Sequence, residues 1–401
     1  METLKSKKEV SALALLFAFT YMVSYMTRTN FGAIISEMEN ATRIPRELLS
    51  VALTGSFVTY GIGQIVSGII GDRVSPKKLV TIGLVMTTAM NLLIPVAGDP
   101  YLMIGCWCVN GFAQSFMWPP IVKLMSALLT EEDYQKTTVK VNWGGQAGTI
   151  AVYLFGSLIV SLLSWQWVFV GCALIGGATI FLWNRFCRDI PVGKSAAITG
   201  QKVSGRILFT PVMLFVMVAI ILMGMLRDGV TTWMPSYIKE TYNLGSAVSI
   251  LTGVILPVFG IVSFQAASTL YRKRFTNPLV CGGLIFALGA VSAVLLFLAS
   301  GKSAALSVLF SALLTGCMHG VNLLLVCMLP AYFKKYGNVS TASGVINACT
   351  YVGSAISTYG IAVLSGVIGW SNTVLLWAFI ALAGAVICVL CARPWSRKFA
   401  K

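Results

Sequence analysis

Long apolar stretches, separated by short polar ones, run from end to end of this 401-residue chain. A helix needs about 20 mostly apolar residues to cross the hydrocarbon core of a bilayer, and twelve stretches reach that length. They lie near residues 11–36, 47–71, 78–98, 100–126, 138–163, 166–185, 209–237, 246–271, 277–299, 303–331, 340–365 and 369–393. The period-2 alternation of a transmembrane β-barrel is absent. The pattern predicts an all-α membrane protein with twelve transmembrane helices.

The longest polar interruption, residues 187–208, divides these stretches six and six. It predicts an N-terminal six-helix bundle over 1–186, a cytoplasmic linker over 187–208 and a C-terminal six-helix bundle over 209–401. Shifting the sequence against itself supports a repeat. A shift of 199 aligns Arg28 with Arg227, Tyr60-Gly61-Ile62 with Phe259-Gly260-Ile261 and Arg73 with Arg272, and a shift of 205 aligns Gly111 with Gly316, Asn142 with Asn347 and Gly148 with Gly353. We therefore expect two pseudo-symmetric bundles with substrate bound between them near mid-membrane.

The formal net charge is +16, but the basic residues are not distributed as a nucleic-acid-binding surface. With both termini placed in the cytoplasm, 23 of the 29 Lys and Arg fall on the inner side, four fall on the outer side and the remaining two are placed deep in the membrane. This asymmetry follows the positive-inside rule. We expect a multi-pass protein of the cell (inner) membrane with no nucleic-acid partner.

Composition also argues against an enzyme. Charged residues make up 10% of the chain, against about 25% in soluble domains, and no stretch remains for a catalytic domain. The ten cysteines show no metal-ligand spacing, and no catalytic triad or nucleotide-binding loop occurs. We expect no enzymatic activity, no cofactor and no metal. The expected partners are a small anionic substrate and the lipid bilayer, and the expected functional unit is a monomer.

Two arginines, Arg28 and Arg227, lie deep within predicted spans, one half-chain apart. Placing a guanidinium at the centre of a bilayer costs about 2.5–3.5 kcal/mol even on the lenient insertion scale. Its rigid fork of donors matches a phosphate or carboxylate. We therefore expect both arginines to line a water-filled cavity in which the cargo supplies the missing anion.

Three local motifs make the chain resemble the organophosphate:phosphate antiporters of the major facilitator superfamily, the glycerol-phosphate and hexose-phosphate carriers. The first span contains Tyr25, Arg28, Asn30 and Phe31 in the pattern Y-x-x-R-x-N-F. The fourth contains Gly111, Gln114, Trp118, Pro119 and Pro120 in the pattern G-x-x-Q-x-x-x-W-P-P. The seventh contains Arg227, Gly229, Trp233, Pro235, Tyr237, Lys239 and Glu240 in the pattern R-x-G-x-x-x-W-x-P-x-Y-x-K-E. The loop after the second span, Gly68-Ile69-Ile70-Gly71-Asp72-Arg73-Val74-Ser75-Pro76-Lys77-Lys78, resembles the superfamily's cytoplasmic signature.

The resemblance implies that Arg28 and Arg227 hold the phosphoryl group of the cargo. It also implies a conformational latch at Asp72 and Arg73, in which the carboxylate bonds a basic group or a helix N-terminus. A plain topogenic basic loop is the alternative for that segment. Family members often carry a Lys where this chain has Gln64, a His at Gly145 and an acidic residue at Pro257. Uncharged residues therefore occupy the positions around the expected phosphate site where family members often carry ionisable side chains.

Further candidates for the substrate site share a polar or aromatic side chain within a predicted span. They are Tyr25 and Tyr21, one and two turns before Arg28, Asn142 and Gln146 on the fifth span, Asn347 as the repeat mate of Asn142, and Gln64 on the second span. The tyrosines either donate to the substrate or pack, and the amides either line the cavity or bond between helices. The Trp118-Pro119-Pro120 segment is expected to kink the fourth span.

Two ionisable residues depart from the family pattern. Asp228, beside Arg227, is expected to face a neighbouring helix or the cavity wall, because adjacent helix positions diverge by about 100°; its other interpretation is partial neutralisation of the arginine cluster. His319, the only histidine, is a candidate for proton relay, for lining the cavity or for simple packing. Both are candidate coupling residues.

Together these features predict a secondary transporter of organic phosphate anions, exchanged for inorganic phosphate by alternating access. In the empty carrier, two uncancelled positive charges are expected to hinder closure, so that exchange becomes obligatory. A proton-coupled transporter of another organic anion, a carboxylate or sulfonate, is one alternative. A transporter-like sensor of a sugar phosphate is another.

Overall fold

The computed structural model describes residues 4, 6–190, 205–243, 246–275, 277–336 and 338–399. The chain forms two compact units. The N-terminal unit comprises Met1–Val203 and Phe333–Ala348, and the C-terminal unit comprises Ser204–Tyr332 and Cys349–Lys401. The predicted linker, 187–208, falls mostly on 191–204, outside the described residues. The predicted division into bundles at that linker stays a prediction.

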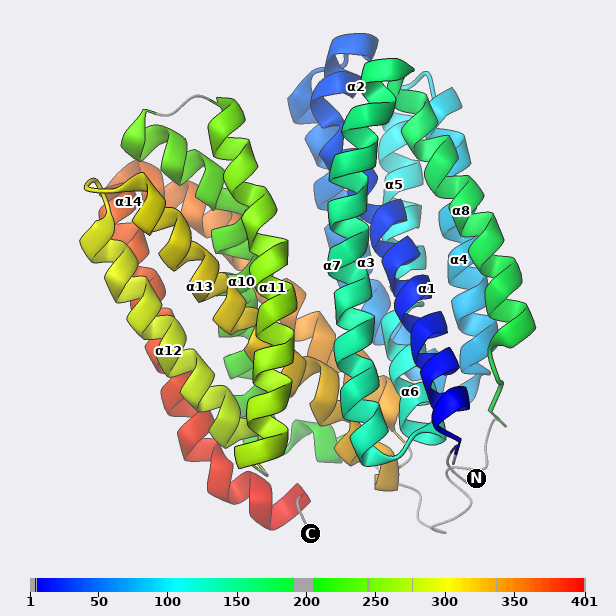
Figure 1. Ribbon diagram of the computed structural model, residues 1–401, viewed down its shortest axis with the longest axis vertical. Coiled ribbons are helices and arrows are strands. Elements are labelled where there is room, and N and C mark those ends of the chain that lie inside the picture. The colour runs from blue at the N-terminus through cyan, green and yellow to red at the C-terminus, as the bar shows by residue number, and fades with distance from the viewer. Residues whose placement is uncertain are drawn as a thin grey trace. The chain divides into compact units, whose positions relative to one another are not determined.

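The N-terminal unit consists of helices joined by short turns (Figure 1). They are α1 Lys7–Ala33, α2 Ile35–Thr42, α3 Arg46–Arg73, α4 Pro76–Leu93, the 3₁₀ turn η1 Ile94–Val96, α5 Pro100–Gln114, α6 Trp118–Leu128, α7 Glu131–Leu162 and α8 Trp165–Phe186. Side-chain caps start several of them: Ser75 accepts from the backbone of Lys78, Asp99 from Leu102 and Thr130 from Asp133. α1 packs against α7 and α8, and α3 against α5.

The C-terminal unit is also helical, and its chain leads back into the N-terminal unit through one segment. Its elements are η2 Gly205–Phe209, α10 Pro211–Tyr242, α11 Ser246–Arg274, α12 Pro278–Ala299, α13 Ala304–Asn322, the π-helical η3 Leu323–Met328, the 3₁₀-helical η4 Leu329–Tyr336 and α14 Val339–Phe399. The end of η4 and the first ten residues of α14 belong to the N-terminal unit. α13 packs against α10, α11 and α12.

These helices correspond to the predicted spans and confirm the all-α membrane fold. Among the described residues, nine segments are long and apolar enough to cross a membrane. The fourth span consists of two shorter helices, because α5 ends at Gln114 and α6 begins at Trp118, which confirms the break expected at Trp118-Pro119-Pro120. α14 joins the last two predicted spans across Gly369, whose φ of 76° is left-handed. A glycine tolerates that conformation at little cost.

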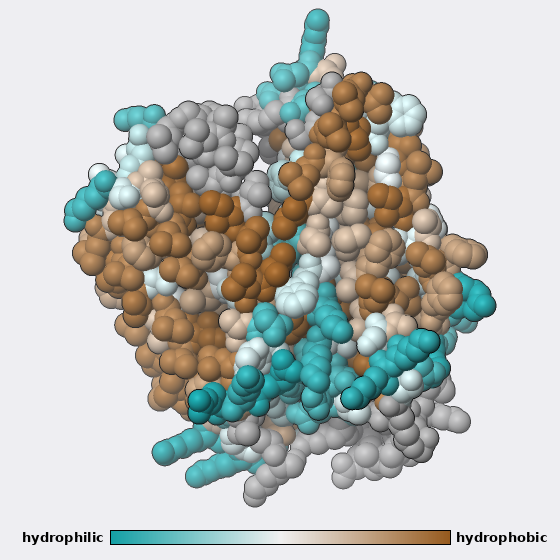
Figure 2. All heavy atoms as spheres, viewed as in Figure 1, coloured by the Kyte–Doolittle hydropathy of each residue, from teal (hydrophilic) through white to brown (hydrophobic). Residues whose placement is uncertain are grey.

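The outer surface is apolar, as the bilayer requires. Large apolar side chains such as Leu15, Phe155, Phe181 and Leu390 are well exposed. Figure 2 shows apolar side chains over the flanks of the helices and hydrophilic ones gathered toward the helix ends. The polar residues Asn30, Gln64, Asn91 and many serines and threonines are instead fully buried. Polar groups inside a membrane are placed where neighbouring helices satisfy them.

The same close helix contact occurs in both units and confirms the predicted repeat. A Cβ added to Gly148 of α7 would strike the carbonyl of Met22 on α1, and one added to Gly353 of α14 would strike the carbonyl of Ile221 on α10. Met22 and Ile221 are 199 residues apart, and Gly148 and Gly353 are 205 apart. These are the two shifts seen in the sequence. Small residues at these positions allow the helix that carries each arginine to approach its neighbour closely.

Candidate functional site

Arg28 lies in the N-terminal unit close to two tyrosine rings. Its guanidinium carbon is 4.3 Å from the ring centroid of Tyr25 on the same helix and 4.9 Å from that of Tyr60 on α3. The side chain is only partly buried. A cation–π contact holds a guanidinium through its face and does not itself use an N–H donor. The arginine that the sequence predicted for anion binding is therefore in contact with two aromatic rings.

Tyr25 and Tyr21 contribute to this arrangement by packing. The ring of Tyr21 lies 5.0 Å from that of Tyr25 and 5.2 Å from that of Trp118, measured between centroids. Gly145 of α7 faces Tyr25 so closely that an added Cβ would lie 3.0 Å from the ring. The glycine that replaces the family's histidine thus makes room for the tyrosine beside Arg28. A role for either tyrosine in donating to the substrate stays a prediction.

A buried network of amides fixes the backbone next to Arg28. The carbonyl of Thr27 accepts hydrogen bonds from Asn91 and from Asn110, each at 3.1 Å. Gln114 donates to the Thr27 hydroxyl at 2.9 Å and accepts from Ser24 at 2.5 Å. α4 and α5 therefore both hold the turn of α1 that carries Arg28. This gives a physical reason for the glutamine of the fourth-span motif.

Asn91 also connects that turn to the following residue. It accepts from Asn30 at 2.7 Å, and its own amide reaches the Thr87 carbonyl at 2.9 Å. Asn30 in turn accepts from the backbone N–H of Phe31 at 3.0 Å. Asn30 and Phe31 complete the first-span motif, and the structure shows them in positioning contacts within the N-terminal unit.

Gln64 and Asn347 are brought together, although they are far apart in the sequence. Asn347 donates to the Gln64 side-chain oxygen at 3.0 Å within the N-terminal unit. The Gln64 nitrogen is buried and has no hydrogen-bond partner among the described residues. Asn142 donates to the Thr138 carbonyl of its own helix at 2.9 Å, and Gln146 is partly buried one turn later. Contact of these four amides with a substrate stays a prediction.

In the C-terminal unit, Arg227 is paired with the carboxylate next to it in the sequence. Its Nε donates to Asp228 Oδ1 at 2.6 Å, and one terminal nitrogen donates to Oδ2 at 2.8 Å. The other terminal nitrogen donates to Asn322 of α13 at 2.9 Å. Residues 227 and 228 point in different directions from the helix axis, but the long arginine side chain curls around the helix and reaches the carboxylate. The expectation of two uncancelled positive charges in the empty protein is therefore wrong for Arg227.

Asp228 both faces a neighbouring helix and neutralises the arginine, so its two interpretations hold together. Ser354 of α14 donates to its Oδ2. His319 lies on α13, one turn before Asn322, and its Nδ1 is 2.8 Å from the Thr315 carbonyl. Because a carbonyl only accepts, that nitrogen carries the hydrogen. The helix changes from α to π directly after Asn322, a distortion that is frequent at functional sites.

The predicted latch residue Asp72 lies at the N-terminus of another helix. Its carboxylate accepts from the backbone N–H groups of Ser340 at 3.1 Å and Thr341 at 2.8 Å, the second and third residues of α14. Lys123 lies 3.8 Å from the carboxylate and donates to the Gly71 carbonyl at 2.8 Å. A carboxylate here satisfies free N–H groups and the helix dipole. Arg73, the last residue of α3, is exposed. A gating role for both stays a prediction.

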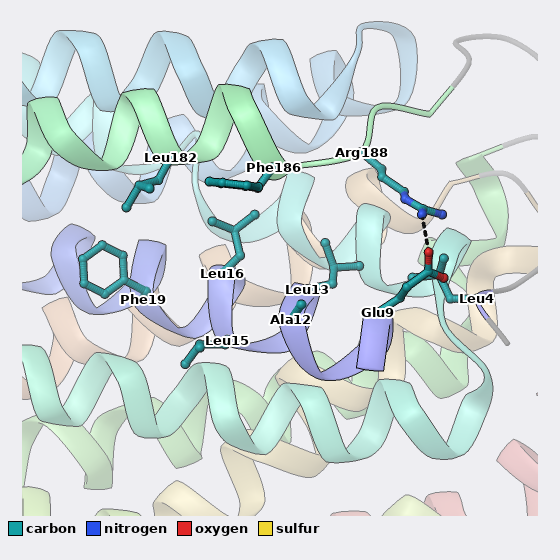
Figure 3. A pocket seen from close by; sticks show the side chains of 10 residues that line it. All are labelled: Leu4, Glu9, Ala12, Leu13, Leu15, Leu16, Phe19, Leu182, Phe186 and Arg188. Carbon is teal, nitrogen blue, oxygen red and sulfur yellow. Dashed lines mark hydrogen bonds and ion pairs between the residues drawn. The ribbon is translucent and has the colours of Figure 1, made fainter. Parts of the chain in front are cut away.

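An apolar groove elsewhere on the N-terminal unit is separate from these clusters. It has a volume of about 520 Å³ and lies between α1 and α8 (Figure 3). Leu13 and Leu16 face Leu182 and Phe186, and Arg188 pairs with Glu9 at 2.7 Å beside them. None of the predicted site residues lines this groove. Its lining matches the apolar face that the unit presents to lipid.

The sequence missed four residues that hold the two arginines. Tyr60 was noticed only as part of a repeat match, whereas Asn322, Ser354 and Asn91 were not singled out. Asn322 is three residues after His319, so helical spacing would have placed it on the same face. Nothing in the sequence distinguishes Ser354 from the many other serines in spans. Among the described residues, no group of His, Cys, Asp and Glu is arranged to hold a metal ion.

Comparison with known proteins gives a family match and a fold match. Residues 17–358 match the family model described as Major Facilitator Superfamily. The membrane sensor protein UhpC of Salmonella typhimurium is 21% identical over 92% of this chain and 88% of its own length. A probable hexose phosphate transport protein of Chlamydia pneumoniae is 21% identical over 88% and 84%. The crystal structure of the fucose:proton symporter FucP of E. coli matches with a TM-score of 0.78 at 12% identity, over 96% of this chain and 99% of FucP. At that identity the likeness concerns the fold.

Proposed function

Because the chain belongs to the Major Facilitator Superfamily, we propose that it is a secondary transporter of organic phosphate anions. A sugar phosphate or glycerol phosphate is the proposed cargo, and inorganic phosphate is the proposed exchange partner. The single observation that carries this proposal is the setting of Arg28. Its guanidinium is in cation–π contact with Tyr25 and Tyr60, and a guanidinium has a planar fork suited to bidentate binding of a phosphoryl group.

Two further observations support the phosphate class. A similar protein that covers most of the chain carries the name of a hexose phosphate transport protein. The buried and unsatisfied amide nitrogen of Gln64 offers a neutral donor where the family often has a lysine. A neutral amide in place of a cation leaves the cargo held by fewer positive charges. The proposed cargo is therefore a small ester that also offers hydroxyl groups to hydrogen-bond.

Alternating access needs a contact that forms in one state and breaks in the other. The bond between Asp72 and the first turn of α14 is suited to this role. It satisfies two N–H groups at a helix end. At an aqueous interface water can replace the carboxylate as their acceptor, so the free-energy cost of breaking the contact is small. We place both termini in the cytoplasm and the protein in the inner membrane, following the distribution of basic residues.

The test is counterflow in proteoliposomes. Vesicles loaded with labelled inorganic phosphate are diluted into buffer with or without glycerol 3-phosphate or glucose 6-phosphate. Efflux that requires an external phosphate ester supports exchange, and equal efflux in both buffers contradicts it. External lactate and methanesulfonate serve as competitors for the alternative cargo class. If they drive efflux as well as the phosphate esters do, the phosphate assignment is wrong.

A second function, sensing of a phosphate ester, is favoured by the similarity to a protein named as a membrane sensor over 92% of this chain. A sensor binds its ligand and moves little of it. Measuring binding and flux on one preparation separates the two functions. Tight binding of glucose 6-phosphate without counterflow supports sensing, whereas flux that rises with ligand occupancy supports transport.

A further inference from the structure

Asp228 occupies the same donors of Arg227 that an anionic cargo would use. Its two carboxylate oxygens accept from Nε and one terminal nitrogen of Arg227, at 2.6 and 2.8 Å. This is the bidentate arrangement in which a guanidinium binds a phosphate or carboxylate. The remaining terminal nitrogen donates to Asn322. A phosphate therefore gains this edge of the guanidinium only when the Asp228 carboxylate leaves it.

Ser354 allows Asp228 to exist in two hydrogen-bonded states. Its single hydroxyl has two acceptors within reach, the Asp228 carboxylate and the Thr350 carbonyl at 3.0 Å. When Asp228 is ionised, the hydroxyl donates to the carboxylate. When Asp228 is protonated, the acid O–H donates to the hydroxyl oxygen, which then donates to Thr350. In both states the Ser354 hydroxyl stays hydrogen-bonded to Oδ2 of Asp228.

We propose that Asp228 is a proton acceptor that competes with the cargo for Arg227 and thereby couples anion binding to proton uptake. In the empty protein the carboxylate is ionised and bound to Arg227. On binding, the carboxylate takes up one proton from the solvent, and the anion accepts the two Arg227 hydrogen bonds that the carboxylate had accepted. On release the proton returns to water and the carboxylate rebinds. One proton thus accompanies each anion. This inference rests on the proposed function and adds the coupling ion.

The charged and titratable groups around Asp228 are few among the described residues. Arg227 is on its own helix, and His319 on α13 lies within electrostatic reach of both. α14 contributes the neutral Ser354. The charged residues of α11 are confined to its last turn, Arg272, Lys273 and Arg274. Nδ1 of His319 is engaged with Thr315, so its Nε2 is the competing proton acceptor that the experiment must exclude.

The linkage has a definite sign. Because the anion-bound protein holds the proton, anion affinity rises as the pH falls, by up to about tenfold per pH unit for one linked proton. The rise ends where Asp228 is already protonated in the empty protein. By reciprocity, bound anion promotes protonation of Asp228 to the same extent. A permanently neutral side chain at this position removes both effects.

The test counts protons by calorimetry on the purified full-length protein. Inorganic phosphate and glycerol 3-phosphate are titrated in buffers of different ionisation enthalpy, with the wild type and Asp228→Asn. The probe's own protonation change is common to both proteins, so the difference between them reports Asp228. We expect the wild type to take up about one more proton per anion and Asp228→Asn to bind about tenfold more tightly at pH 8. Equal proton counts overturn the inference.

Two further variants keep the test decisive. His319→Gln should still take up the extra proton on anion binding. If His319→Gln loses this proton uptake and Asp228→Asn keeps it, the histidine is the coupling residue and the inference is overturned. Ser354→Ala removes the partner of both states and should reduce the pH dependence of binding; it serves as the second variant if Asp228→Asn does not fold. Failure of the wild type to bind either anion at any pH rejects the proposed function itself. Binding without proton linkage leaves that function standing.

Discussion

Arg28 and Arg227 occupy equivalent positions in the two repeats, but their neighbours hold them by different forces. Arg28 is in cation–π contact with two tyrosine rings. Arg227 is bound through its edge by a carboxylate and an amide. The close contacts at Gly148 and Gly353 show that helix packing around the two arginines is the same in both units. The repeat has therefore preserved the scaffold and diverged in its chemistry.

This difference assigns separate tasks to the two halves. A cation–π contact does not itself use an N–H donor, which suits an arginine that binds an anion. A guanidinium whose edge is occupied by the protein's own carboxylate changes partner when the cargo arrives. On this view Arg28 provides affinity, and Arg227 provides the response to binding. The following predictions test that division, beginning with the largest effect.

Replacing Arg28 with lysine should lower phosphate counterflow by about 100-fold. Lysine keeps the charge but loses the planar fork, and losing one charge-assisted hydrogen bond costs about 1.5–3 kcal/mol, or one to two orders of magnitude. Counterflow in proteoliposomes measures the effect. Arg185→Lys is the matched control, because Arg185 also lies over an aromatic ring, Phe186, but at the exposed end of α8. Similar losses in both variants would show that Arg28 has no special part in transport.

Replacing Arg227 with glutamine should also lower the stability of the protein, reducing the free energy of unfolding by about 2 kcal/mol. Removing one partner of a fully buried ion pair costs about 3–5 kcal/mol; here the Asp228 side chain is 30% exposed, so the cost is smaller. The double variant Arg227→Gln/Asp228→Asn should recover most of the loss, since no unpaired charge remains. Thermal unfolding in detergent measures both. A double variant no more stable than Arg227→Gln contradicts the ion pair.

Adding a methyl group at the repeated glycines should destabilise the two units about equally. The Cβ of Gly148→Ala and of Gly353→Ala would each meet a backbone carbonyl of the arginine-bearing helix. Overpacking costs about 1–3 kcal/mol, partly offset by the better helix propensity of alanine. Gly177→Ala and Gly366→Ala, where nothing lies within 4 Å, should be neutral or slightly stabilising. If only one of the Gly148→Ala and Gly353→Ala variants is destabilised, the two similar helix contacts do not contribute equally to the free energy of unfolding.

The scaffold was predictable from the sequence because bilayer thickness imposes a length on every span. The length of the apolar stretches predicted the helices, and Trp118-Pro119-Pro120 predicted the break between α5 and α6. The two sequence shifts of 199 and 205 residues predicted the repeat. For Asp72, the family resemblance implied a bond to a basic group or to a helix N-terminus, and the carboxylate accepts from the first turn of α14. These inferences depend on local composition or on chain geometry, which a single sequence contains.

The immediate partners of the arginines were harder to predict, because they depend on side-chain conformation. Adjacent helix positions diverge, so Asp228 was not expected to bind Arg227 through both oxygens; a long side chain can curl around the helix and close that gap. Asn322 and Ser354 come from helices whose rotation about their axes the sequence does not specify. Tyr60 is one of 13 tyrosines, and only packing shows that its ring meets Arg28.

The smallest expected effect distinguishes stacking from hydrogen bonding at Arg28. Tyr60→Phe keeps the ring face and should leave counterflow within about twofold of the wild type, whereas Tyr60→Leu removes the face and should raise the half-saturating phosphate concentration by about fivefold. A buried cation–π contact is worth about 1–2 kcal/mol, so loss of one of two faces loosens the fork without removing its charge. Both variants keep a large apolar residue at a buried position, and thermal unfolding checks that each remains folded. If Tyr60→Phe is as impaired as Tyr60→Leu, Tyr60 acts through its hydroxyl, and Tyr25 alone holds Arg28 by a ring face.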